Sequence, residues 1–417
     1  MLLTNYRLEA CEMAAIGARV LLASSLALYV VFVGASSLAT PTAESIPIQS
    51  NYHVLDLSWT GVNHGWALVE VPCGKAQCEE LLVTTDGIHW SIAGPVPAIS
   101  PCWSSYKYCA SKVRFANSHV GYVFDPDLLM TTDAGRSWKR LAGATLALEI
   151  ANGQVVRITG SIDPCFPHCP LRIETSDVGT TSWRTVLAHL LGTADYPSLQ
   201  RNGNRIYAAL TGNTAGGAEY PSPISTSDDG GTHWTNDVDP CGGTTSMFVG
   251  MSAAPSRQVV VQCYVRRGVT PANSLFVSGD SGESWAGPYP WSAAVDEYEA
   301  AGVAVSSSGI IVRVTGKRLR SFVYTDVVIE VSTNHGRTWQ QKADLRTALS
   351  GPVWVGFEDA STARVMVSDL LWTSSHGGQS WTKSRFDWIQ VSSQADAQSS
   401  DQGFQVGTPN FPGHRTE

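Results

Sequence analysis

The chain has 417 residues, of which 43% are hydrophobic and 15% are charged, and its formal net charge is −8. The charged share is well below the roughly 25% typical of globular proteins. The negative balance excludes a general attraction to nucleic acid or to an anionic membrane surface. Length alone favours two or three domains, but internal repeats favour one large repeat domain instead.

Residues 1–45 differ in composition from residues 46–417. The segment 20–33 is strongly apolar, comes directly after Arg19 and leads to Ser37-Leu38-Ala39, a sequence suited to signal-peptidase cleavage. The length of this segment, 14 residues, fits the apolar region of a signal peptide, which is about 7–15 residues long, better than a membrane span of about 20. A cleaved signal peptide is favoured, with Met13 as an alternative start. The alternative is an uncleaved anchor, which would be the protein's contact with a membrane. Both place the protein outside the cytoplasm: secreted, periplasmic or at the cell surface.

One short pattern recurs seven times along the rest of the chain. Its full form reads Ser/Thr, any residue, Asp, any residue, Gly, any residue, Ser/Thr, Trp, as in TTDAGRSW at 131–138 and SGDSGESW at 278–285. The other copies, at 84–90, 175–183, 227–234, 332–339 and 374–381, differ in one position or by one residue in length. The third position holds Asp86, Asp133, Asp177, Asp229, Asp280, Asn334 and His376. The last position holds Trp90, Trp138, Trp183, Trp234, Trp285, Trp339 and Trp381.

Each residue of this pattern has a physical role in a tight turn. The Asp carboxylate can accept backbone N–H bonds from residues just after it, and the Gly can adopt a positive φ. The Trp begins the next strand and brings a large apolar surface to bury. The pattern therefore predicts a β-hairpin tip followed by an anchored strand. Because the turn occupies the carboxylate, these acidic residues are predicted to be structural rather than catalytic or calcium-binding.

The spacing of the tryptophans indicates the architecture. Successive copies are 42 to 54 residues apart, and periods of about 40–50 residues in a β-rich chain are typical of propeller blades. The sequence predicts an all-β, seven-bladed β-propeller over 46–388, with four antiparallel strands per blade. Residues 389–417 are rich in Ser, Gln, Asp and Gly and are predicted to be a disordered tail. The first strands of the seven blades are predicted at 54–58, 113–116, 146–150, 196–200, 246–251, 302–306 and 353–357.

The repeats resemble the Asp-boxes of BNR (bacterial neuraminidase) repeat proteins over about residues 50–386. That group includes sialidases, sortilin-type receptors, some endoglucanases and propellers of the photosystem II assembly factor type. A second repeat, LSWTGVNHGWA at 57–67 and VRFANSHVGYV at 113–123, is most similar to the last type. The resemblance implies the propeller fold. It leaves the activity open, because function depends on a site and not on a fold.

Eight of the nine cysteines form close pairs in sequence. Exported proteins use such pairs as disulfides, so the predicted bonds join Cys73 to Cys78, Cys102 to Cys109, Cys165 to Cys169 and Cys241 to Cys263. Reduced buried thiols are the less favoured alternative. A zinc site at Cys165-Phe166-Pro167-His168-Cys169 is disfavoured, because no second Cys/His cluster with zinc spacing completes it. No metal or cofactor is expected.

A four-stranded propeller blade divides its connections between two faces. The turns between strands 3 and 4 share one face, here called the turn face, with the loops between strands 1 and 2. Loops between strands 2 and 3, and between strand 4 and the next blade, share the opposite face, here called the loop face. The loop face holds the longer connections and the cysteine pairs, so it is the candidate binding face. The alternative is that the disulfides only stabilise long loops. Aromatic and basic residues there suit a glycan or protein ligand: Trp103, Tyr106, Tyr108, Tyr289, Trp291, Arg266, Arg267, Lys317, Arg318 and Arg320. Solvated loop charge is the alternative for the basic ones.

Enzymatic activity would require particular catalytic residues in the sequence. Sialidases need an arginine cluster, and the first arginine typically precedes the first Asp-box, yet no arginine lies between Thr40 and Asp86. A glycosidase needs two facing carboxylates, for which the candidates in or near inner strands are Asp56, Glu149, Asp195, Asp239, Asp296, Glu299 and Glu358. The nucleophile elbow, the P-loop and the Rossmann pattern are all absent from the sequence.

The sequence therefore predicts an exported, monomeric binding or scaffold propeller without catalytic residues. Its ligand would be a protein or a glycan. A glycoside hydrolase and an assembly factor for a membrane complex are the alternatives.

Overall fold

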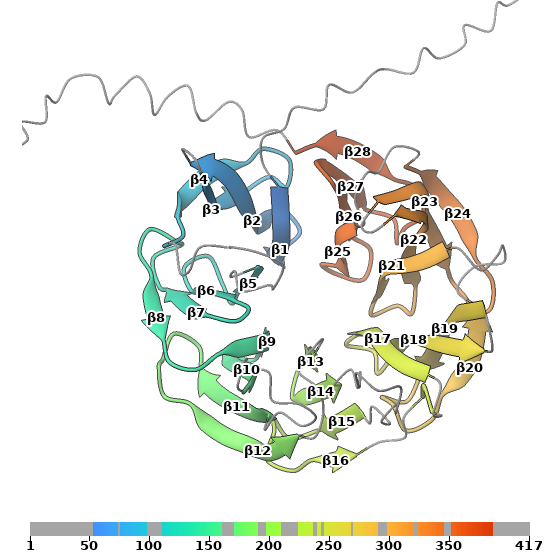
Figure 1. Ribbon diagram of the computed structural model, residues 1–417, viewed down its shortest axis with the longest axis horizontal. Coiled ribbons are helices and arrows are strands. Elements are labelled where there is room, and N and C mark those ends of the chain that lie inside the picture. Colours follow the sequence, from blue (N-terminus) through green and yellow to red (C-terminus); the bar gives the residue numbers. More distant parts are fainter. Residues whose placement is uncertain are drawn as a thin grey trace, which may run out of the picture. The chain divides into compact units, whose positions relative to one another are not determined.

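A computed structural model describes residues 53–73, 76–97, 111–160, 171–190, 197–209, 224–236, 240–242, 246–267, 270–290, 298–320, 323–345 and 352–386. These residues form seven four-stranded antiparallel sheets arranged in a ring (Figure 1). Each sheet consists of four strands that are consecutive in the chain, with the first strand nearest the central channel. The predicted seven-bladed propeller is thus confirmed. No helix that could cross a membrane occurs in the described ranges.

Blades 1 to 4 occupy the first half of the ring. Blade 1 contains β1 (His53–Gly61), β2 (His64–Cys73), β3 (Ala76–Thr84) and β4 (Ser91–Pro95). Blade 2 contains β5 (Lys112–Phe115), β6 (Gly121–Phe124), β7 (Leu128–Thr131) and β8 (Lys139–Leu141). Blade 3 contains β9 (Thr145–Ala151), β10 (Gln154–Thr159), β11 (Leu171–Asp177) and β12 (Arg184–Leu190). Blade 4 contains β13 (Ser198–Asn202), β14 (Arg205–Ala209), β15 (Ile224–Ser227) and β16 (Thr235–Asn236).

The remaining strands belong to blades 5 to 7. Blade 5 contains β17 (Ser246–Ala253), β18 (Val259–Arg267), β19 (Thr270–Ser278) and β20 (Ala286–Pro290). Blade 6 contains β21 (Tyr298–Val305), β22 (Ile311–Arg320), β23 (Val323–Ser332) and β24 (Gln340–Asp344). Blade 7 contains β25 (Pro352–Phe357), β26 (Ala363–Val367), β27 (Leu370–Ser374) and β28 (Thr382–Arg385).

The hydrophobic core lies between neighbouring blades. Each of the seven clusters of buried apolar residues in the described part combines side chains from two adjacent sheets. Between blades 1 and 2, the ring of Trp66 stacks on Phe115 with centroids 3.9 Å apart, and Leu68 packs with Val113 and Val123. Because each sheet buries both of its faces, its central strands are almost continuously apolar, as β6 and β26 show.

The repeated pattern forms the turns between the third and fourth strands. In blade 2, the Ser137 N–H donates to Asp133 Oδ1 over 2.8 Å, and the Ser137 hydroxyl donates to Oδ2 over 2.6 Å. The Thr131 hydroxyl donates to Asp133 and accepts the N–H of Gly135. Gly135 has a φ of +91°, and a Cβ there would lie 2.4 Å from Leu81 of blade 1, so this turn needs glycine.

The other copies close their turns in related ways. Asp86, Asp229, Asp280 and Asn334 accept backbone N–H bonds through their side chains. The 175–183 copy uses the backbone instead, because the Asp177 carbonyl accepts from the N–H and the hydroxyl of Thr180. The carbonyl of His376 likewise accepts the N–H of Gln379. The tryptophans lie one residue before the fourth strands rather than within them, and Trp90 is buried in the core.

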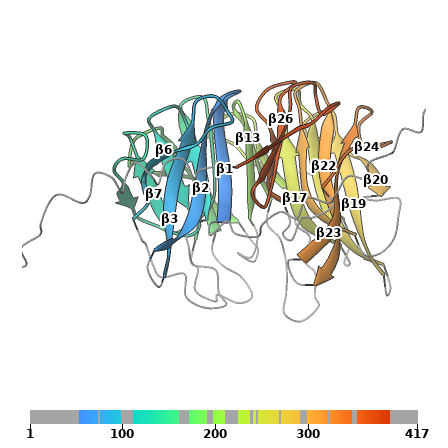
Figure 2. The ribbon, with the colours of Figure 1, turned by 90° about the horizontal axis from the view of Figure 1, so that it is seen from above.

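The turns and the loops between strands 1 and 2 share one face, as predicted. The N–H of Ala134 in a turn donates to the carbonyl of His119 in a loop, and Ser281 donates in the same way to Arg257. Seen from the side, the sheets stand as radial blades whose strands run between the two faces (Figure 2). Short loops on the turn face are therefore braced by main-chain hydrogen bonds.

Blades 1 and 7 close the ring without sharing a strand. Apolar side chains of both blades form one cluster, in which the rings of Trp90 and Phe386 lie 4.6 Å apart. Arg364 of blade 7 also donates to the carbonyls of Val62 and Gly87 in blade 1. The junction between these two blades is called the seam below.

Candidate functional site

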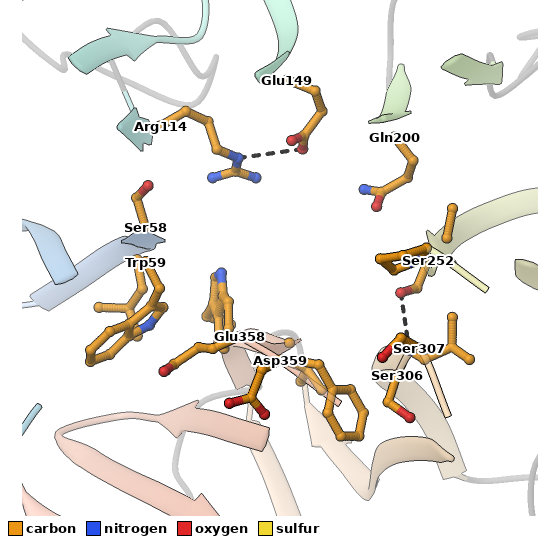
Figure 3. A pocket seen from close by; sticks show the side chains of 18 of the residues that line it. Ser58, Trp59, Arg114, Glu149, Gln200, Ser252, Ser306, Ser307, Glu358 and Asp359 are labelled. Atoms are coloured by element: carbon orange, nitrogen blue, oxygen red, sulfur yellow. Dashed lines mark hydrogen bonds and ion pairs between the residues drawn. The ribbon is translucent and has the colours of Figure 1, made fainter. Parts of the chain in front are cut away.

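A cavity of about 380 Å³ lies in the central channel. It is lined by the ends of the first strands β1, β5, β9, β13, β17, β21 and β25 and by residues that follow three of them. The lining strand segments lead into the loops between strands 1 and 2, so the cavity lies at the turn-face end of the channel. Figure 3 shows that side chains from all sides of the ring surround this space.

Blades 1 to 3 contribute a charged cluster to the cavity wall. Arg114 Nη1 donates to Asp56 Oδ2 over 2.7 Å, and Arg114 Nε donates to Glu149 Oε1 over 3.4 Å. Asp56 is buried and also accepts the N–H of Val113. Arg114 keeps 26% of its side chain exposed and Glu149 keeps 20%. Both groups can therefore be reached from the cavity.

The charges of this cluster compensate one another. Burial disfavours the charged guanidinium, but the carboxylates of Asp56 and Glu149 outweigh burial and hold the pKa of Arg114 above its usual value. Burial raises the pKa of Glu149, and Arg114 opposes that shift. One guanidinium facing two carboxylates gives this side of the cavity more acidic than basic groups.

Glu358 lies on the opposite side of the cavity, where blade 7 meets blade 1 (Figure 3). Its side chain is 1% exposed and forms an ion pair with Arg364 through Oε1. The second oxygen, Oε2, is buried and has no hydrogen-bond partner among the described residues. Burial raises the pKa of Glu358 to about 7, although the charge of Arg364 pulls it down.

Asp359 adds a second carboxylate to this side of the cavity. Its Oδ1 accepts the N–H groups of Ser361 and Thr362 over 2.7 and 2.6 Å. These bonds lower the pKa of Asp359. The carboxylate therefore closes the loop between β25 and β26.

The rest of the cavity wall is polar and uncharged, or aromatic. Gln200 of β13 points into the cavity, and its side chain makes no hydrogen bond to the described residues. Ser252, Ser306 and Ser307 supply hydroxyl groups beside it (Figure 3). Aromatic rings come from the two blades at the seam: Trp59, Trp354 and Phe357.

At two junctions of the ring, side chains of one blade accept main-chain N–H groups from the inner strand of the next blade. Ser58 of blade 1 accepts the N–H of Phe115 in blade 2 over 2.8 Å. Ser252 of blade 5 accepts the N–H of Val305 in blade 6 over 3.1 Å. Together with the bond from Val113 to Asp56, these contacts link neighbouring blades and occupy donors that would otherwise face the channel.

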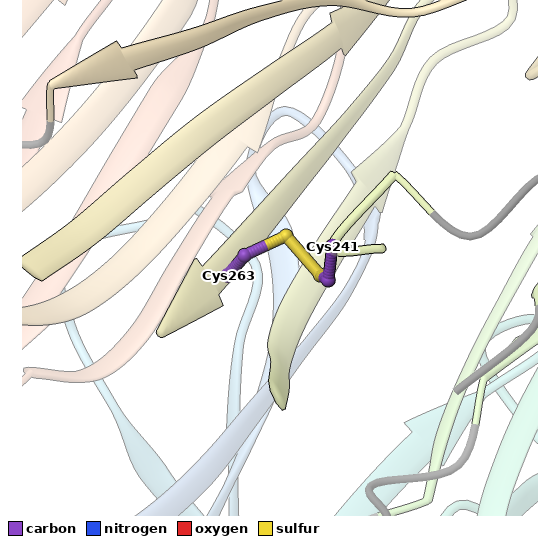
Figure 4. The surroundings of a disulfide bond; sticks show 2 residues. All are labelled: Cys241 and Cys263. Carbon is purple, nitrogen blue, oxygen red and sulfur yellow. A yellow bond between two sulfur atoms is a disulfide. The ribbon is translucent and has the colours of Figure 1, made fainter. Parts of the chain in front are cut away.

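The predicted cysteine pairs of the loop face lie partly within the described ranges. Cys241 and Cys263 form a disulfide across a sequence separation of 22 (Figure 4). Both are buried in the cluster between blades 4 and 5, so the bond fixes the segment that enters blade 5.

Cys78 is disulfide-bonded, and Cys73 ends the facing strand β2. Only residues 74–75 separate β2 from β3, so this connection is short rather than long. Cys102, Cys109, Cys165 and Cys169 lie outside the described residues.

Several predicted ligand-binding residues lie in strands rather than loops. Arg266 and Arg267 end β18, and Lys317, Arg318 and Arg320 belong to β22, because the β18–β19 and β22–β23 hairpins extend further than the apolar pattern indicated. Tyr289 lies in β20 and packs against the core between blades 5 and 6. Trp103, Tyr106, Tyr108 and Trp291 lie outside the described residues.

Sequence reasoning identified Asp56, Glu149 and Glu358 as inner carboxylates but missed Arg114, Gln200 and the serines. These missed residues lie near the ends of the first strands or directly after them, and each strand contributes only one or two. That shared position is visible only once the first strands are aligned with one another. Within the described ranges, no three His, Cys, Asp or Glu side chains form a metal-ligand set.

Solved structures share the fold with this chain at low sequence identity, from 11 to 18% in three of them. No family model matches the sequence, and no curated protein matches it. A structure of YCF48 bound to D1 peptide is 18% identical, with a TM-score of 0.51, over 78% of this chain and 94% of that one. The GH74 xyloglucanase from Xanthomonas campestris is 13% identical, with a TM-score of 0.50, over 81% of this chain and 54% of that one. A puromycin hydrolase is 11% identical, with a TM-score of 0.51, over 80% and 54%. These similarities establish the propeller fold alone, because binding proteins and hydrolases share it.

Proposed function

We propose that the protein is an exported, non-catalytic binding propeller that recognises a protein or a glycan through the loop face. The supporting observation is that the acidic side chains lining the cavity are already engaged. Glu149 is paired with Arg114, Glu358 with Arg364, and Asp359 with its own turn. A glycosidase needs one carboxyl group as acid and a second as base or nucleophile, and this cavity offers no such pair among its described residues.

A glycoside hydrolase is the alternative, and one observation favours it. A carboxyl group with a pKa of about 7 is suited to general acid catalysis near neutral pH. Glu358 would need a second, free carboxylate across the cavity, and Glu149 would have to leave Arg114 to supply it. An assembly factor for a membrane complex is a third proposal. It is compatible with the fold shared with YCF48, which was solved with a bound peptide.

The test is a glycan-array and polysaccharide-binding screen of the purified protein, with product analysis of every hit. Binding without release of sugar is the expected result. Trp103→Ala and Trp291→Ala should weaken that binding, whereas Gln340→Ala on the outer strand β24 should not. Released oligosaccharides would replace this proposal with the hydrolase. If no glycan binds, crosslinking at the cell surface should recover a protein partner, and failure of both searches would overturn the binding proposal.

A further inference from the structure

The central cavity has two chemically different sides. Aromatic residues of blades 7 and 1, Trp354 and Trp59, line one side. Arg114, Glu149 and Gln200 of blades 2 to 4 line the other. Aromatic faces can pack on the C–H face of a ring, and guanidinium, carboxylate and amide groups offer planar sets of donors and acceptors. This arrangement suits a ligand that has an apolar face and hydroxyl groups at its edge.

Electrostatics narrows the class of ligand further. Arg114 is already flanked by Asp56 and Glu149, so an incoming anion would meet two carboxylates for one guanidinium. Asp359 adds another negative charge at the rim. An acidic ligand is therefore disfavoured, whereas a neutral polyhydroxylated ligand carries no charge for these carboxylates to repel.

The occupied main-chain donors argue against an extended peptide. A peptide that adds to a strand edge is held mainly by main-chain hydrogen bonds. Here the N–H groups of Val113, Phe115 and Val305 are taken by side chains of the preceding blades. Side chains that face the cavity offer other polar groups: the Gln200 amide, the Ser307 hydroxyl and the partly exposed guanidinium of Arg114 (Figure 3).

We propose that the turn-face cavity is a binding site for a neutral sugar residue of a glycan chain. The cavity volume of about 380 Å³ is within the range of about 300–1,000 Å³ of small-molecule sites. Gln200 and Arg114 would bind hydroxyl groups, and Trp354 would cover the sugar ring, because Arg364 and Gly65 already pack against the ring of Trp59. The inference rests on the proposed binding function but places this site on the face opposite the loops.

The experiment uses the full exported chain and defined probes. Cellotetraose, xylotetraose and mannotetraose serve as neutral glycans, with trigalacturonate and tetralysine as charged comparisons, in isothermal titration calorimetry. At least one neutral tetrasaccharide is expected to bind, and trigalacturonate is expected to bind more weakly. Gln200→Ala should weaken that binding about five- to tenfold, the loss expected for one or two hydrogen bonds. The matched control Gln340→Ala, which is exposed on β24, should leave it unchanged.

A second variant separates this site from the loop face. Gln200→Trp would fill the cavity and should abolish binding, while circular dichroism and the melting temperature check that the variant is folded. Glycan binding that survives Gln200→Trp but is lost in Trp103→Ala would overturn the cavity site and leave the proposed function intact. Absence of binding by all three neutral glycans, or tighter binding of tetralysine than of any of them, would also overturn it. Release of sugar would instead contradict the proposed function.

Discussion

Burial and charge pairing act in opposite directions on Glu358. Its side chain is almost completely removed from solvent and has one oxygen without a partner among the described residues. Burial favours the neutral acid, and Arg364 favours the carboxylate. The resulting pKa of about 7 means that burial prevails and that the group changes charge near physiological pH.

Glu358→Gln should remove a pH dependence of stability. A carboxyl whose pKa is raised in the folded state stabilises the fold fully below its unfolded pKa of 4.5. That contribution is lost as pH rises through about 7, and the linkage amounts to about 3 kcal/mol at most. The melting temperature of the wild type should therefore fall between pH 5 and pH 8 relative to that of the variant. Calorimetry across this range measures the effect.

Glu283→Gln is the matched control, because this carboxylate is exposed. Its melting temperature should follow that of the wild type at every pH. Parallel curves for the wild type and Glu358→Gln would show that Glu358 does not titrate in this range.

The Asp-containing turns predict the opposite pH dependence. Hydrogen bonds from the Ser137 hydroxyl and N–H hold the pKa of Asp133 at about 2. A lowered pKa stabilises the fold above the unfolded value of 3.8 and loses that contribution as pH falls toward 2. At pH 7, the melting temperature of Asp133→Asn should not exceed that of the wild type. Any difference between the two melting temperatures should become smaller as pH falls from 4 to 2.

The reciprocal change uses a turn that already contains Asn. Asn334 accepts the N–H of Thr338 and donates to its hydroxyl. Either an Asn or an Asp side chain can therefore close this kind of turn. Asn334→Asp should make blade 6 more sensitive to acid, as measured by melting temperature at pH 2 and pH 4. Equal acid sensitivity of both variants and the wild type would exclude a role of these carboxylates in acid unfolding.

The role of a residue could be predicted from the sequence where its contacts are with residues nearby in the chain. The turn residues were assigned from the sequence because Asp133 and Ser137 are four positions apart. The cavity cluster was not assigned, because Arg114 meets Asp56 and Glu149 across 58 and 35 positions. Only the packing of neighbouring blades brings such residues together.

At the scale of elements, strand number and order were predictable but strand length was not. The repeat of the tryptophans was enough to place four strands in each blade. Apolar patterning placed Arg320 in a loop, yet β22 and β23 continue as a ladder to Arg320 and Val323. Main-chain hydrogen bonds can extend a hairpin beyond its apolar residues. A prediction based on the apolar pattern of side chains therefore ends such strands too early.

The disulfide between Cys241 and Cys263 should stabilise blade 5 measurably. It closes a segment with a sequence separation of 22, and the loss of chain entropy in the unfolded state corresponds to about 3 kcal/mol. The double variant Cys241→Ala/Cys263→Ala should therefore lower the unfolding free energy in urea by about that amount.

Non-reducing peptide mapping of the wild type should recover the four predicted local pairs. Free thiols at Cys102 and Cys109 would contradict the proposed disulfides of the loop face.

At the scale of the whole molecule, the seam is the junction where the chain does not run directly from one blade to its neighbour. Among the described strands, none of blade 1 joins the sheet of blade 7. Arg364 reaches across with bonds to two carbonyls of blade 1 and lies 4.0 Å from the ring centre of Trp59. Its ion pair with Glu358 fixes it in blade 7. The same residue therefore supports both the cavity wall and closure of the ring.

Arg364→Ala should open the seam, and Arg157→Ala is the matched comparison. Arg157 is similarly buried, pairs with Glu174 and lies 4.0 Å from the ring of Trp183, all within blade 3. Removing Arg364 leaves the buried carboxyl of Glu358 without its ion-pair partner, so Arg364→Ala should cost about 3–5 kcal/mol in urea unfolding. Arg157→Ala should cost less, because Glu174 keeps its ion pair with Arg172. Hydrogen exchange should distinguish them. In Arg364→Ala, exchange should rise in β1–β4 and in β25–β28 together, because two blades lose a shared contact. In Arg157→Ala it should rise in β9–β12 alone. Faster exchange confined to blade 7 in Arg364→Ala would show that the apolar cluster around Trp90 and Phe386 holds the ring closed without it.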